Sequence, residues 1–145
     1  MNQTRSYIVS ARDIRRFAQA IGDPDMSYLR DLGSGNEDQG RLRAPPLFCQ
    51  MFAYDDIPVE ALPADGSPKE LDVKVPADRT VGGGSEFEIF EPVFEGDVIT
   101  VCSRVLEIHS KQGRSGRLYF ILLETTFHNQ HNDLVCREVA TYIKR

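Results

Sequence analysis

The sequence lacks the features that mark several classes of protein. Its three cysteines, Cys49, Cys102 and Cys136, are far apart and form no Cys-x-x-Cys pair, so they indicate neither a zinc site nor a disulfide framework. No segment approaches the roughly 20 apolar residues that span a bilayer, and the first residues contain no apolar signal segment. We therefore expect a soluble, cytoplasmic protein with reduced thiols, no membrane contact and no metal.

Positive charge is also scarce. The 17 Lys and Arg residues are outnumbered by 22 Asp and Glu, which gives a formal net charge of -5. Because nucleic-acid binding depends on clustered cations, we expect no nucleic-acid partner. The sequence contains neither a Gly-x-Ser-x-Gly motif nor a Cys-His signature, so nothing supports hydrolysis by a nucleophilic side chain. With 145 residues and no internal repeat, residues 1–145 are expected to form a single domain.

Two apolar segments in the first half predict helices. In the first, Ser10 can cap a helix that Gly22 ends, and its apolar stripe consists of Ile14, Phe17, Ala18 and Ile21. The second is predicted over 47–54, where Pro45 and Pro46 suit the first turn and the stripe consists of Leu47, Phe48, Met51 and Phe52. We expect the second helix to be buried, and the polar stretch between the two, Asp31 to Gln39, to be a surface loop.

The second half predicts an antiparallel sheet. Strong turn signals separate four candidate strands, which are 85–92, 97–108, 117–128 and 134–144. The strand 117–128 is apolar on both faces, as expected for a central strand covered on both sides. One cover is the helix 47–54, and the other is a candidate subunit interface. The proline-rich stretch 55–84 predicts little regular structure, although 71–75 could form a short strand or lie along a partner.

The stretch from Gly22 to Tyr28 has the layout of an acid/base motif. An aspartate five residues before a histidine, just after a helix, would form a proton-transfer pair, but Tyr28 occupies the fifth position after Asp23. A tyrosine with a pKa near 10 is a poor general base at neutral pH. Asp23 is either a residual acid or a turn residue, and Tyr28 either lines a channel or packs half-buried.

A glycine run and three histidines are weaker candidates. The run Gly82-Gly83-Gly84 is not flanked by a strand and a capped helix with lysine, so the sequence does not favour a phosphate loop. It either borders a substrate channel or forms a bend at the start of a strand. The histidines are expected at strand ends or turns on the surface, without metal-binding spacing, and are His109, His128 and His131.

Four stretches together resemble the N-terminal-type domain of MaoC-like dehydratases. They are Phe17-Ala18-x-x-Ile21-Gly22-Asp23-Pro24, Arg43-Ala44-Pro45-Pro46-Leu47-Phe48, Arg79-Thr80-Val81-Gly82-Gly83-Gly84-Ser85-Glu86-Phe87-Glu88, and Pro92-Val93-x-x-Gly96-Asp97-x-Ile99-Thr100. The resemblance implies an α+β hotdog fold, in which a curved antiparallel sheet wraps around a central helix. It also implies an acyl chain carried on coenzyme A or acyl carrier protein, no further cofactor, and reversible addition of water across a trans-2-enoyl thioester.

The resemblance also implies which catalytic parts are missing. Catalytic relatives carry a motif similar to Asp-x-Asn-Pro-x-His, in which Asp23 matches the aspartate, Asp25 replaces the asparagine and Tyr28 replaces the histidine. In those relatives a backbone amide at the entrance of the buried helix polarises the thioester carbonyl. Pro46 lies near that position and has no N–H to donate.

The resulting hypothesis is a subunit of a heteromeric (R)-specific enoyl-CoA hydratase or 3-hydroxyacyl-thioester dehydratase, whose homologous hotdog partner supplies the Asp and His. This chain would shape the acyl channel, and its candidate substrate-binding residues are Tyr28, Pro45, Pro46, Phe48, Gly82, Gly83 and Gly84. Two alternatives stay open. One is an independent acyl-CoA thioesterase that uses Asp23 or another carboxylate, and the other is a non-enzymatic module that binds acyl thioesters.

Overall fold

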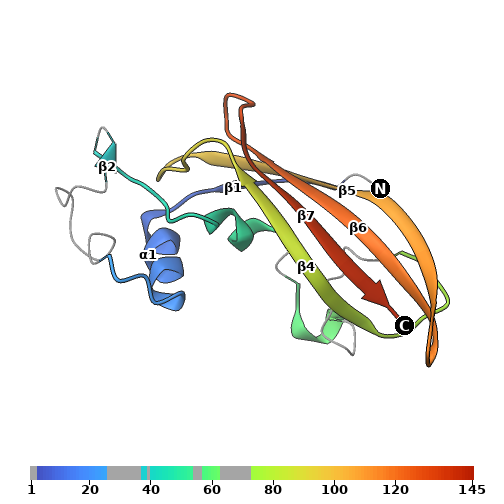
Figure 1. The fold of residues 1–145 in the computed structure, drawn as a ribbon. Helices are drawn as coiled ribbons and strands as arrows, with labels where there is room; N and C mark the ends of the chain where they lie inside the picture. The colour runs from blue at the N-terminus through green and yellow to red at the C-terminus, as the bar shows by residue number, and fades with distance from the viewer. Residues whose placement is uncertain (1–2, 26–36, 39, 54–56, 63–72) are drawn as a thin grey trace.

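The computed structural model describes residues 3–25, 37–38, 40–53, 57–62 and 73–145. One antiparallel sheet of five strands, in the order β1-β5-β6-β7-β4, dominates it. The strands are β1 Gln3–Ile8, β4 Thr80–Ile89, β5 Val98–Gly113, β6 Gly116–His128 and β7 Leu134–Lys144, and a small separate pair consists of β2 Glu37–Asp38 and β3 Arg41–Leu42. Figure 1 shows the sheet curving, with the helical elements on one side of it. The predicted α+β class is confirmed.

Helix α1, Ala11–Ala20, forms as predicted. The Ser10 side chain accepts a hydrogen bond from the backbone N–H of Asp13, and Gly22 follows the helix with a φ of 67°. Ile14 and Ala18 are buried in the core, with Phe17 packed against them. Ile21 was expected on the same stripe, but it is the C-cap residue and its exposed fraction is 54%. That expectation is wrong because the helix ends one residue too early to turn Ile21 inward.

The second predicted helix is shorter and of a different type. Instead of an α-helix over 47–54, the chain forms a 3₁₀ helix, η2, over Phe48–Phe52. Leu47 has a left-handed backbone with a φ of 66°, which places Pro45 and Pro46 before the helix rather than in its first turn. Hydrogen bonds from Gln50 N to Leu47 O and from Ala53 N to Gln50 O span three residues, which is the 3₁₀ pattern.

All four predicted strands are present in the five-stranded sheet, and its fifth strand, like the small pair β2 and β3, was not predicted. Strand β6 lies in the centre of the sheet as expected, and its Ile121 and Phe127 are fully buried. Strand β4 begins at Thr80, five residues before its predicted start. The unpredicted strand β1 pairs with β5, from Gln3 opposite Ser103 to Ile8 opposite Val98.

Between η2 and β4, the described residues 57–62 and 73–79 have little regular structure, as predicted for the stretch 55–84, whose last five residues belong to β4. They include the short 3₁₀ helix η3 over Val59–Ala61. Residues 73–75 form no strand, and the rest of the expected 71–75 strand lies outside the described residues. The predicted surface loop 31–39 also lies outside them, except for β2. None of the helices in the described part of the chain is long and apolar enough to cross a membrane.

The main core lies between the inner face of the sheet and the two helical elements α1 and η2. Phe48 anchors it, because its ring meets Phe17 of α1 edge-on at 5.6 Å and Phe52 edge-on at 5.3 Å. Tyr7 of β1 stacks on Phe52 at 5.1 Å and thereby joins η2 to the edge of the sheet. Aromatic contacts therefore fix the position of η2 against the sheet.

Candidate functional site

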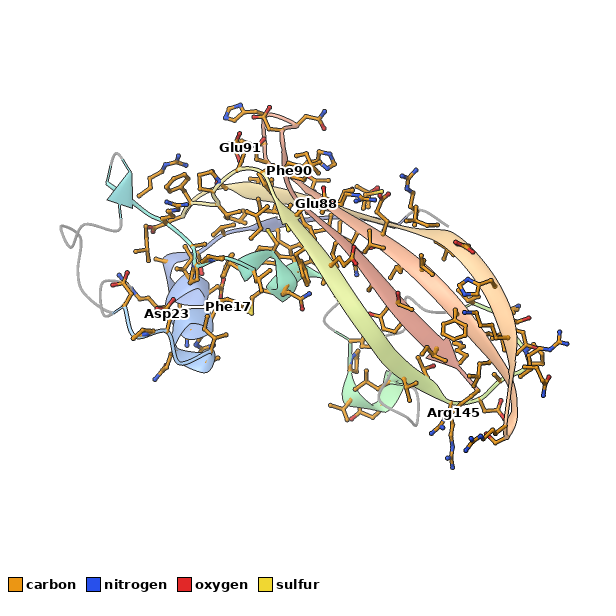
Figure 2. All side chains as sticks on the ribbon, viewed as in Figure 1. Phe17, Asp23, Glu88, Phe90, Glu91 and Arg145 are labelled. Carbon is orange, nitrogen blue, oxygen red and sulfur yellow. The ribbon has the colours of Figure 1, made fainter. Side chains whose placement is uncertain are left out.

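A pocket of about 430 Å³ opens between the start of η2, the end of β4 and the beginning of β7. One wall is the segment that leads into η2, with Pro45, Pro46 and Leu47. The opposite wall contains Ile89 and Phe90, whose exposed fractions are 53% and 48%. Figure 2 shows Phe90 and Glu91 where the chain leaves β4. The pocket thus has two largely apolar walls from segments far apart in the sequence.

Backbone hydrogen bonds hold these walls in place. Ala44 N donates to Val93 O at 2.8 Å, and Arg43 forms an isolated bridge with Phe94. On the other side, Phe90 N donates to Val135 O at 3.0 Å. The segment before η2 is thus tied by its backbone to the connection that follows β4, and that connection is tied to β7, so backbone bonds fix both walls of the pocket.

The pocket is apolar inside and charged at its rim. Phe48, Cys49 and Cys136 are buried lining residues, whereas Arg43 and Glu91 are exposed. Among the described residues that line the pocket there is neither an aspartate nor a histidine. The arrangement can hold an apolar group beside a polar mouth. Its described lining residues offer no His and Asp pair for proton transfer.

The structure brings together three of the sequence-predicted site residues. Pro45, Pro46 and Phe48 all line the pocket. Asp23 does not, because it lies just beyond α1, where its Oδ1 accepts a hydrogen bond from Asp25 N at 2.9 Å. Figure 2 shows Asp23 at the end of α1, well apart from Phe90. This geometry is an Asx turn, the turn alternative for Asp23. Tyr28 lies outside the described residues.

The glycine run Gly82 to Gly84 lies inside strand β4 and is not among the residues that line the pocket. The pairing of β4 with β7 is irregular between Gly82 and Gly84, and Gly84 has a φ of 131°. A Cβ atom on Gly83 would lie 3.1 Å from the carbonyl oxygen of Thr141. The run therefore permits a bulge and a close backbone approach within the strand, rather than a bend before it. Its proximity to an acyl channel stays a prediction.

The histidines are not gathered at this site. His109 was expected at a strand end, but it lies inside β5 and stacks on Phe120 with 5.0 Å between the ring centroids. His128 ends β6 and His131 lies in the following turn, as predicted. In the described ranges, no three His, Cys, Asp or Glu side chains come close enough to hold a metal ion.

Sequence reasoning missed two polar features beside the pocket. The thiols of Cys49 and Cys136 line the same pocket and shift each other's pKa, although no sequence spacing signals a pair so far apart in the chain. Glu138 lies two residues along β7 from Cys136, is buried, and accepts a hydrogen bond from Gln50. Burial raises the pKa of Glu138 above its usual range, against the opposing effects of hydrogen bonds with Ser85 and Gln50. The alternation of β7 could have placed Glu138 inward, in phase with Cys136.

Comparison with known proteins gives matches over most of the chain. Residues 1–138 match the family model described as the FAS1-like dehydratase domain region. A protein of Streptomyces griseus designated UPF0336 is 24% identical over 142 residues, covering 98% of this chain and 87% of that protein.

Two solved structures from Mycobacterium tuberculosis have the same fold. The HadBC (3R-hydroxyacyl-ACP dehydratase) complex, truncated at a C terminus, matches with a TM-score of 0.70 and 18% identity, covering 99% of this chain and 94% of that one. The ChsH1–ChsH2 complex matches with a TM-score of 0.75 and 17% identity, covering 98% and 86%. At these identities the likeness concerns the fold, and the predicted hotdog architecture is confirmed.

Proposed function

Because the chain belongs to the family of FAS1-like dehydratase domain regions, we propose that it is the non-catalytic subunit of a heteromeric enoyl-CoA hydratase or 3-hydroxyacyl-thioester dehydratase with (R) specificity. In this proposal the pocket between η2 and β4 receives part of the acyl group. A homologous hotdog subunit supplies the aspartate and the histidine. The observation that carries the proposal is a pocket with apolar walls and no aspartate or histidine of its own among its described lining residues.

The chemistry of the pocket supports acyl binding without proton transfer. Hydration of an enoyl thioester requires one group to activate water and another to deliver a proton to the α carbon. It also requires a hydrogen-bond donor that stabilises the negative charge developing on the thioester oxygen. Pro46 lines the pocket at the entrance of η2 and has no N–H to donate there. Phe48, Ile89 and Phe90 instead offer apolar surface.

The edge of the sheet supports a protein partner. Strand β4 is the last strand in the order β1-β5-β6-β7-β4, and no strand of this chain's described residues pairs with its outer edge. Its Val81 and Ile89, and the adjoining Phe90, have exposed fractions of 40–53%. Open strand edges with apolar side chains favour pairing with another chain. Both HadBC and ChsH1–ChsH2 are complexes, which is consistent with a hotdog partner.

The proposed substrate is an acyl thioester of coenzyme A or acyl carrier protein, with no additional cofactor. The exposed side chains of Arg43 and Glu91 stand at the rim of the pocket, where the polar part of a thioester carrier would pass. Arg43 suits a phosphate or carboxylate group on such a carrier.

The proposal is tested by reconstitution. The chain is purified alone and together with a homologous hotdog protein that carries an Asp-x-Asn-Pro-x-His motif, ideally one encoded next to it. Hydration of crotonyl-CoA and of longer enoyl-CoA substrates is followed by loss of the conjugated double bond. We expect activity from the mixture, weaker activity from the partner alone, and none from this chain alone. Robust hydration by the isolated chain would overturn the non-catalytic assignment, and release of free thiol from acyl-CoA would favour a thioesterase.

A further inference from the structure

Two of the three cysteines meet at the pocket, although neither has a role in the proposed function. Cys49 belongs to η2 and Cys136 to β7, and both line the pocket with exposed fractions of 5% and 2%. The third cysteine, Cys102, lies on β5 and is not among the residues that line the pocket. The fold therefore brings two thiols from distant parts of the sequence to one solvent-connected cavity.

The two thiols are not equivalent. Their interaction with each other raises the pKa of Cys49 and lowers the pKa of Cys136. Burial adds to the rise at Cys49, whereas at Cys136 burial and the nearby carboxylate of Glu138 oppose the fall. Cys49 thus holds its proton more tightly than Cys136 does. Because the thiolate is the attacking species in disulfide exchange, Cys136 is the better nucleophile of the pair.

We propose that Cys49 and Cys136 form a redox-active dithiol that closes to a disulfide when a small organic disulfide enters the pocket. The Cys136 thiolate attacks one sulfur of the oxidant, its S–S bond breaks, and one thiolate leaves. Cys49 then gives up its proton and attacks the Cys136 sulfur, so that the second half of the oxidant leaves as a thiol. Two electrons pass from the protein to the oxidant, and the protein gains one S–S bond.

The disulfide would fasten η2 to β7 at the base of the pocket. At present Gln50 and Glu138 join the same two elements through one hydrogen bond. A covalent link here closes a loop of roughly 90 residues, which restricts the unfolded chain strongly. The oxidised protein should therefore unfold at a higher temperature and hold the walls of the pocket more rigidly. This inference does not depend on the identity of the pocket's substrate.

The test uses the full chain and 2-hydroxyethyl disulfide, the oxidised form of 2-mercaptoethanol, as the probe. The folded, reduced protein is incubated with the probe, quenched with acid, and mapped by mass spectrometry of its peptides. We expect a Cys49–Cys136 crosslink and a fall in the count of free thiols from three to one. The midpoint of thermal unfolding should rise by roughly 5–15 °C and return to its starting value after dithiothreitol.

Variants separate the roles of the three cysteines. Cys102→Ser is the matched control and should form the crosslink as the wild type does. Cys49→Ser should retain a 2-mercaptoethanol adduct on Cys136, because no resolving thiol remains. Cys136→Ser should acquire its adduct on Cys49 several-fold more slowly. The peptide map of the wild-type protein tests the crosslink without any substitution. It therefore remains decisive even if one of the variants does not fold. Persistence of both thiols in the reduced state, or a crosslink through Cys102, would overturn the proposal.

Discussion

The Nε2 atom of Gln50 on η2 donates a hydrogen bond of 3.2 Å to the carboxylate of Glu138 on β7. This contact joins the short helix that forms one wall of the pocket to a strand near the centre of the sheet. Glu138 is only 4% exposed, so an acidic group has been placed inside the domain with few polar partners. The pair therefore links the geometry of the pocket to the protonation state of one buried carboxyl group.

The raised pKa of Glu138 predicts a specific pH dependence of stability. The unfolded chain releases this proton near the ordinary glutamate value of about 4.3, whereas the folded protein holds it to higher pH. The folded state binds more protons in that window, so the contribution of Glu138 to stability falls as pH rises through it. Glu138→Gln should therefore gain stability relative to wild type between acid and neutral pH, measured by urea unfolding.

The control for that experiment is Glu86→Gln on the exposed side of β4. This substitution should change the free energy of unfolding by less than about 1 kcal/mol, because exposed carboxyl groups interact weakly with their surroundings. If the free energies of unfolding of Glu138→Gln and wild type differed by the same amount at every pH, the conclusion that burial raises the pKa of Glu138 would be contradicted.

Glu124 predicts the opposite pH dependence. It lies on β6 between Arg104 of β5 and Arg137 of β7, and hydrogen bonds from both reach its carboxylate. These contacts, Arg104 first, lower the pKa of Glu124 despite its burial. The stabilising contribution is present above the ordinary pKa of about 4.3 and is lost as pH falls through the lowered value.

Glu124→Gln should therefore destabilise the protein by about 1–3 kcal/mol at neutral pH, and the difference should shrink in strong acid. Chemical unfolding at several pH values measures it. Glu88→Gln is the comparison, because Glu88 also contacts Arg137 but its side chain is 59% exposed. This substitution should lower the free energy of unfolding by less than about 1 kcal/mol. Equal losses of unfolding free energy from the two substitutions would show that the buried position of Glu124 between two arginines adds no stability.

Backbone strain at Leu47 predicts an unusual response to glycine. Leu47 has a φ of 66°, which costs about 1–2 kcal/mol for a residue with a side chain, whereas glycine adopts this conformation freely. Met51, with a similar exposed fraction of 47%, lies within η2 and has no such strain. Leu47→Gly should therefore cost about 1–2 kcal/mol less stability than Met51→Gly. Thermal and urea unfolding of both variants measure the difference, and equal costs would contradict the strained backbone.

These comparisons show which parts of the molecule could be predicted from sequence. The strands β5 to β7 follow from alternation and strong turn signals, and α1 follows from the Ser10 cap and the stripe of Ile14 and Ala18. Strand β1 could not be predicted, because its six residues are mostly polar and acquire their structure by pairing with β5. The local sequence pattern thus predicts helices and strands that their own residues favour, but not a strand that forms only by pairing with another.

The site was only partly predictable for the same reason. Pro45, Pro46 and Phe48 were found through a sequence resemblance, and they do line the pocket. The left-handed backbone of Leu47 shortened the expected helix, and leucine gives no local signal for that conformation. The contact between Cys49 and Cys136 depends on how η2 sits on β7, which no spacing within the sequence encodes.

The open edge of β4 predicts where a partner binds. Val81 on β4 is 40% exposed and does not line the pocket, so Val81→Lys can disturb the edge without altering the cavity. Val105 on β5, 42% exposed, is the matched control. We expect Val81→Lys to weaken association with the hotdog partner by at least about tenfold, which corresponds to 1.4 kcal/mol, and Val105→Lys to leave it unchanged. Titration calorimetry measures both, and equal affinities would place the interface elsewhere.

The division of labour between two chains is the central claim, and one measurement tests it most directly. The rate of enoyl-CoA hydration is compared for three reconstituted complexes: wild type, Asp23→Ala in this chain, and His→Ala in the Asp-x-Asn-Pro-x-His motif of the partner. The account predicts that the Asp23 variant keeps most of the activity, because Asp23 forms a turn beyond α1 and does not line the pocket. The partner variant should lose at least about 100-fold, the typical contribution of a general acid or base. A large loss from Asp23→Ala, or full activity after removal of the partner's histidine, would contradict the account.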